Sequence, residues 1–176
     1  MIHPEKITHL GIEYSLTHLV DGHGSFAWKT KNGRDVTFNV KTSYADHCYS
    51  DKDLPRQPGC HIVMSRGVER VFCTDRHSRS LSLPDLVNGL FTKPTQTVSF
   101  TAERNYALLY LMMKPPVTKG KRYYVFFHMK WHGSDTSADA FDVQLNVESA
   151  YQKSKTVEFK RLPTFGTVAE ELVFGK

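Results

Sequence analysis

One stretch near the C-terminus alternates apolar and polar residues more strictly than any other part of the chain. In residues 141–151, FDVQLNVESAY, every second position from Phe141 to Val147 is apolar and the positions between are polar. Because successive side chains of a strand point to opposite faces, this pattern predicts a strand with one buried and one solvated face. If the alternation continues, Ser149 and Tyr151 lie on the buried face, where the end of a strand can open into a cleft.

A partner for this strand precedes it in the sequence. Residues 122–131, RYYVFFHMKW, are apolar on both faces apart from His128 and Lys130, which is typical of a central strand. The two segments are close enough in sequence to form a hairpin, so we expect them to pair antiparallel.

A second hairpin is predicted from FAWKTKNGRDVTFNV, which contains the turn signal Asn32-Gly33. A three-residue loop would pair Phe26 with Phe38 and would bring Trp28 opposite an apolar residue. A two-residue turn would pair the same aromatic residues with polar ones. Register follows the face that can be buried, so the three-residue loop is the prediction.

Three further elements can be placed along the chain. CHIVMS and ERVFC predict a hairpin around Arg66-Gly67, and SLPDLVNGLF predicts a short helix with Ser82 at its N-cap. Residues 102–113, AERNYALLYLMM, fit a helix or a strand, and their Ala, Leu and Met content favours a helix. The whole pattern predicts an α+β fold: a single domain, residues 1–176, dominated by an antiparallel β-sheet with two or three short helices.

Composition limits the class of protein. The sequence contains no apolar run of about 18 residues that could span a membrane, and its N-terminus lacks the apolar core of a secretion signal. Three cysteines cannot all pair with one another, which favours a reducing compartment. We therefore expect a cytoplasmic protein with no membrane partner.

Basic residues exceed acidic ones by 23 to 18, and they occur in clusters. Such clusters attract nucleic-acid phosphates, although solvated surface charge is the alternative for each of them. The clusters are Lys114, Lys119, Lys121 and Arg122; Lys153, Lys155, Lys160 and Arg161; and Arg66, Arg70, Arg76 and Arg79.

The segment 45–77 contains all three cysteines and two histidines that could accompany them as metal ligands. A structural zinc site could be drawn from Cys48, Cys60, Cys73 and His77. The spacing argues against it, because zinc ligands usually come in close pairs and the neighbours Cys60 and His61 would face opposite ways on a strand. We therefore expect no metal and no cofactor.

Metal-free cleavage of RNA needs a base for the ribose 2′-hydroxyl, an acid for the departing 5′-oxygen and cations for the phosphate. His47 is the first candidate for base or acid, and His77 is the second. Arg76 and Arg79 would hold the phosphate. Ser149 and Tyr151 would position the ribose or the scissile phosphate.

Two resemblances bear on this hypothesis. The strand YYVFFHMKW, the hairpin, the strand ending in VESAY and the basic segment after it resemble the sheet of the barnase, EndoU, colicin and RelE-like ribonuclease toxins. In that superfamily the last strands often end in a small hydroxyl residue and an aromatic one, which Ser149 and Tyr151 would match. The segments ADHCYS and FCTDRHSRS are similar to uncharacterised bacterial and phage proteins, some related to stationary-phase growth adaptation.

The first resemblance implies a toxin-type endoribonuclease of a bacterium or phage, with RNA as substrate and a neutralising antitoxin or host protein as partner. The alternative is a module of phage or bacterial origin that binds nucleic acid or protein without catalysis, with or without a structural zinc.

Overall fold

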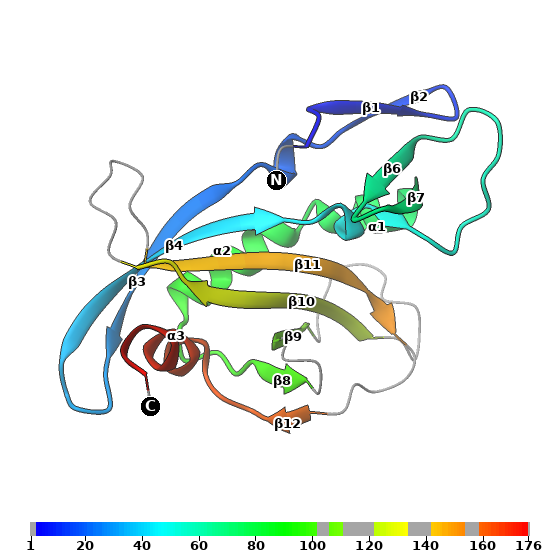
Figure 1. Cartoon of the computed structure of the whole chain (residues 1–176). Helices are drawn as coiled ribbons and strands as arrows, with labels where there is room; N and C mark the ends of the chain where they lie inside the picture. The colour runs from blue at the N-terminus through cyan, green and yellow to red at the C-terminus, as the bar shows by residue number, and fades with distance from the viewer. Residues whose placement is uncertain (1–2, 102–105, 111–121, 134–141, 154–158, 176) are drawn as a thin grey trace.

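The protein, described by a computed structural model, is built around a seven-stranded sheet with strand order β12-β8-β9-β10-β11-β4-β3 (Figure 1). The structure describes residues 3–101, 106–110, 122–133, 142–153 and 159–175. The strands of this sheet are β3 (Gly22–Lys29), β4 (Asp35–Tyr44), β8 (Ser99–Thr101), β9 (Tyr106–Tyr110), β10 (Arg122–Trp131), β11 (Val143–Lys153) and β12 (Phe159–Arg161). The predicted α+β class and the predominance of antiparallel pairing are confirmed.

The predicted central strand is β10, which pairs antiparallel with β9 on one side and with β11 on the other. One face of this pair forms the core. Its buried side chains include Val125, Phe127, Val143 and Leu145. β11 also pairs with β4, and that pair is parallel, with Val143 opposite Val40.

The hairpin of β3 and β4 has the register that the three-residue loop predicts. Phe26 pairs with Phe38, and Trp28 pairs with Val36. Gly33 has φ 78°, a left-handed conformation that glycine adopts without steric cost. Apolar side chains therefore share one face of the hairpin, and that face is covered by helices.

Two helices, α2 (Leu83–Thr92) and α3 (Phe165–Phe174), meet over this hairpin. The ring of Phe26 lies 6.4 Å from Phe91 of α2 and 5.2 Å from Phe165 of α3, between ring centroids. Ser82 precedes α2 as predicted, but its hydroxyl donates to the carbonyl of Arg79 instead of capping the helix. The cause is a third helix, α1 (Thr74–Ser80), which ends just before Ser82.

The prediction of a helix over residues 102–113 is wrong for residues 106–110, the part of this segment that the structure describes. Residues 106–110 form β9, whose Leu108 pairs with Val125 of β10 and whose Tyr106 pairs with Phe100 of β8. Residues 102–105 and 111–113 lie outside the described residues. Pairing between two neighbouring strands outweighs the modest helix propensity of Ala, Leu and Met.

A smaller sheet, ordered β5-β7-β6, lies beside the large one together with the hairpin of β1 (Lys6–His9) and β2 (Ile12–Ser15) (Figure 1). Its strands are β5 (Ser50–Asp51), β6 (Ile62–Ser65) and β7 (Val68–Phe72). Arg66 and Gly67 have φ 49° and 80°, which matches the two-residue turn predicted between β6 and β7. Two 3-10 turns, η1 (Thr17–Leu19) and η2 (Asp46–Cys48), join these parts to the large sheet. None of the described helices is long and apolar enough to cross a membrane.

Candidate functional site

A β-bulge in β11 decides which way Ser149 and Tyr151 face. Phe127 pairs with Val147, whereas the next residue, Phe126, pairs with Ser149, so Glu148 is the extra residue of the bulge. After the bulge Ala150 takes the buried position on the core face. The expectation that Ser149 and Tyr151 share the face of the core residues is therefore wrong, because the bulge turns them to the opposite, outer face of the sheet.

On this outer face a pocket of about 480 Å³ lies between β11 and the smaller sheet. Four of the six residues predicted as catalytic line it: His47, Arg76, Ser149 and Tyr151. They come from η2, α1 and β11, which are far apart in sequence. The remaining lining residues are Asp51, Lys52, Asp53, Ser65, Arg66, Val68 and Arg70.

Hydrogen bonds around His47 define its tautomer. The hydroxyl of Ser65 donates to Oδ1 of the buried Asp46 at 2.9 Å, so its oxygen accepts from Nε2 of His47 at 3.3 Å. The neutral imidazole then carries its proton on Nε2 and its lone pair on Nδ1. Burial lowers the pKa of His47, and the charge of Arg70 lowers it further, whereas Asp46 and Glu148 oppose that shift. The lowered pKa favours the neutral imidazole, whose lone pair on Nδ1 can accept a proton.

Arg76 is held in place on three sides. It donates to the carbonyl of His47 at 3.1 Å and forms an ion pair with Asp51 at 2.6 Å. Its guanidinium also lies 5.1 Å from the ring centroid of Tyr151, which is a cation–π contact. The ring of Tyr151 stacks on Phe126 with centroids 5.4 Å apart. This arrangement fixes a planar cation at the edge of the pocket beside His47.

Three cations of the pocket were not assigned to the site from the sequence. Arg70 is buried and donates to the hydroxyl and the carbonyl of Ser50, so it was predictable only as one of a cluster of arginines. Arg66 extends from the β6–β7 turn, and Lys52 follows β5. Lys52 had no sequence signal, because it lies in a loop rich in both charges and turn residues.

Two predicted residues are not brought to the pocket. His77 donates from Nε2 to the carbonyl of Ser15 at 2.8 Å, and its ring packs against Tyr14 and Phe72 below the β1–β2 hairpin. Arg79 forms an ion pair with Asp75 one helical turn away, at 2.8 Å. Arg76, His77 and Arg79 were predicted together because they are neighbours in sequence. In α1 they point to different surroundings.

The conditional zinc set is not assembled. Cys48 is fully buried, donates to the carbonyl of Val147 and has a raised pKa because of that burial. Cys60 and Cys73 are free thiols in different segments. Within the described ranges, no three His, Cys, Asp or Glu side chains have the arrangement of metal ligands. These cysteines therefore give the pocket neither a ligand set nor a thiolate nucleophile.

Most of the predicted lysine clusters lie where the structure describes no side chains. This applies to Lys114, Lys119, Lys121, Arg122, Lys153 and Lys155. Of the same clusters, Lys160 is exposed, and Arg161 forms an ion pair with Glu171 of α3 at 2.7 Å. Neither of these two residues lines the pocket of His47.

Comparison with known proteins gives one result for the chain. A scan against protein-family models matches residues 6–172 to the model described as the YjaZ family. Neither the curated proteins nor the solved structures contain a match. The match spans the large and the smaller sheet, α1, α2 and most of α3, so the pocket lies within the matched region.

Proposed function

The chain belongs to the YjaZ family, and we propose that it is a metal-independent endoribonuclease whose active site is the pocket of His47. The observation that supports this proposal is the convergence of His47, Arg76, Ser149 and Tyr151 on one pocket from three separate segments. These residue types are the ones that metal-free cleavage of a phosphodiester requires.

In the proposed reaction, Nδ1 of His47 takes the proton of a ribose 2′-hydroxyl. The 2′-oxygen then attacks phosphorus, and the bond from phosphorus to the 5′-oxygen breaks. The hydroxyl of Tyr151 is our candidate to give the proton that the 5′-oxygen needs, and Ser149 would orient the ribose. Arginines stabilise the charge that develops on the phosphate oxygens, because a guanidinium can hold two of them at once.

The test is incubation of purified protein with total RNA in excess chelator, followed by analysis of the new termini. Fragments ending in 2′,3′-cyclic phosphate are expected from the native protein and not from His47→Gln, which keeps a polar side chain but has no base. This variant also excludes a contaminating nuclease as the source of cleavage. RNA that stays intact at micromolar native protein would remove the proposal.

A second candidate is a module that binds nucleic acid or protein without catalysis. It is favoured by the pairing of the pocket's arginines, since Arg76 contacts Asp51 and Arg66 contacts Glu148. His47 is also the single histidine among the described residues that line the pocket. Retention of intact RNA on the protein, with no fragments, would support this candidate.

A further inference from the structure

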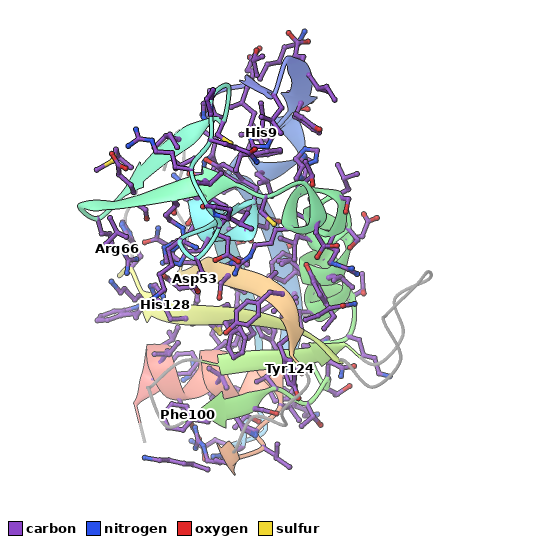
Figure 2. The ribbon with its side chains drawn as sticks, turned by 90° about the vertical axis from the view of Figure 1, so that its right-hand side faces the viewer. His9, Asp53, Arg66, Phe100, Tyr124 and His128 are labelled. Atoms are coloured by element: carbon purple, nitrogen blue, oxygen red, sulfur yellow. The ribbon has the colours of Figure 1, made fainter. Side chains whose placement is uncertain are left out.

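A chain of hydrogen bonds crosses the outer face of the large sheet and ends on Arg66. The hydroxyl of Ser43 on β4 donates to Oδ1 of Asn146 on β11. Nδ2 of Asn146 lies 2.9 Å from Nε2 of His128 on β10. Nδ1 of His128 lies 3.0 Å from Oε1 of Glu148, whose Oε2 is 3.0 Å from Nη2 of Arg66. Figure 2 shows Arg66 on the hairpin of the smaller sheet, on the same side of the molecule as His128.

Each donor in this chain is determined by its neighbours. Oδ1 of Asn146 accepts from Ser43 and also from Gln144, so the amide nitrogen of Asn146 must face His128. Nε2 of His128 therefore accepts, and its proton is on Nδ1, from which it donates to Glu148. Burial lowers the pKa of His128, which keeps the imidazole in the neutral form that this arrangement needs.

The hydrogen-bond network runs from side chains that are mostly covered by neighbouring residues to one that is largely exposed to solvent. The side chains of His128 and Glu148 are 22% and 18% exposed, whereas that of Arg66 is 69% exposed. Arg66 also lines the pocket of His47. A long exposed arginine normally loses rotamer freedom when it binds an anion, and a partner that already restrains it reduces that cost.

We infer that Glu148, itself held by His128, is a positioning residue that keeps the guanidinium of Arg66 at the pocket as a clamp for a phosphate group. This inference rests on the proposed assignment of the pocket to a nucleic-acid phosphodiester. The bulge then has two effects: it turns Ser149 and Tyr151 to the outer face, and it inserts Glu148, the residue that holds Arg66.

The substitution Glu148→Gln separates positioning from simple charge. It removes a negative charge beside a cationic pocket, so electrostatics alone predicts tighter binding of a polyanion. If Glu148 positions Arg66, binding becomes weaker. The probe is a single-stranded oligothymidylate of about 12 nucleotides, which binds through its phosphates but has no 2′-hydroxyl to react. We expect affinity to fall about two- to fivefold, the range of an exposed ion pair.

A matched control is Glu69→Gln. Glu69 pairs with Arg56 at 3.0 Å, as Glu148 pairs with Arg66, but Arg56, unlike Arg66, does not line the pocket. The control loses the same charge and should bind the oligonucleotide as tightly as the native protein or more tightly. In an Arg66→Ala background, Glu148→Gln should no longer weaken binding.

His128 provides the conservative test. His128→Ala should weaken binding, and His128→Gln should recover much of it, because a glutamine can accept from Asn146 and donate to Glu148. Melting temperatures by circular dichroism identify variants that are unfolded. Unchanged or tighter binding by folded Glu148→Gln overturns the inference, as does failure of the native protein to bind the oligonucleotide. Weakened binding by this variant without any RNA cleavage by native protein supports the inference and removes the proposed chemistry.

Discussion

At the scale of single residues, His47 acquires its properties from neighbours that the sequence does not place beside it. Asp46 precedes it in sequence, but Ser65 and Arg70 reach it from the smaller sheet. The surroundings of the proposed base are therefore formed only when the smaller sheet packs beside the large one. Its pH dependence is the most direct consequence.

The pH profile of kcat/KM should have an acidic limb at a pKa below the ordinary histidine value of about 6.5. A base works in its neutral form, and burial lowers the pKa of His47, so the neutral form persists to lower pH. The rate should thus be constant near neutrality and fall only as pH drops through this lowered pKa. Initial rates on a fluorogenic RNA measure it, and an acidic limb centred above 6.5 would contradict the assignment.

The same assay gives the contribution of His47. His47→Gln should lower the rate by about 10² to 10⁴, the usual contribution of a general base. His61 supplies a matched control, because burial also lowers its pKa but it does not line the pocket. His61→Gln should keep the native rate and the acidic limb.

Arg76 and Arg79 test whether a fixed guanidinium in the pocket matters beyond its charge. Both lie in α1 and both have a carboxylate partner, but only Arg76 lines the pocket. Arg76→Lys keeps the charge and loses the planar fork, so single-turnover cleavage at saturating RNA should fall by about tenfold or more. Arg79→Lys should leave that rate unchanged. Equal losses in both variants would point to helix stability as the cause.

At the scale of elements, two glycine-to-alanine substitutions test how closely helices pack against the sheet. A Cβ added to Gly166 in α3 would lie 2.2 Å from the ring of Trp28. Gly166→Ala should therefore destabilise the protein by about 1–3 kcal/mol. Gly89 in α2 has nothing within 4 Å of its added Cβ, so Gly89→Ala should stabilise by up to about 1 kcal/mol through helix propensity. Denaturant unfolding measures both, and a stabilised Gly166→Ala would contradict the α3 packing.

Whether an element could be predicted depends on how far apart in sequence the residues lie that interact to form it. The β3–β4 register and the turn at Arg66 depend on side chains a few residues apart, and both were predicted. The bulge at Glu148 was not, because the strict alternation ends at Val147 and was assumed to continue through Ser149. β9 was missed because its pairing with β8 and β10 is a tertiary interaction.

The residues of the candidate site likewise differ in whether the sequence alone could identify them. The sequence identified His47, Arg76, Ser149 and Tyr151 by residue type, and the structure places them in one pocket. It also led to His77 and Arg79, because proximity in sequence was taken for proximity in space. Lys52 and Arg66 came to the pocket only through the position of the smaller sheet. The sequence thus predicted which types of residue the site needs, but only the fold shows which of the candidate residues lie together in the pocket.

At the scale of the whole molecule, the net charge of +5 and the charge of the pocket predict different salt dependences of binding. Lys52, Arg66, Arg70 and Arg76 line the pocket with Asp51 and Asp53, which leaves an excess of two positive charges. For single strands, the logarithm of affinity falls with the logarithm of salt concentration by about 0.7 per neutralised phosphate. Binding at the pocket alone then gives a slope of about −1.4, whereas engagement of the whole net charge gives about −3.5.

We expect the shallower slope for the oligothymidylate, measured by fluorescence anisotropy over a series of salt concentrations. Lys52→Ala should reduce its magnitude by about 0.7, because one phosphate contact is lost. Lys6→Ala is the control, since Lys6 pairs with Glu13 on the β1–β2 hairpin and does not line the pocket. A slope near −3.5 that Lys52→Ala does not change would place the nucleic acid on the lysine clusters of residues 114–122 and 153–161 instead. In that case the pocket of His47 would not be the principal binding surface, and the reacting phosphate would have to be sought at those clusters.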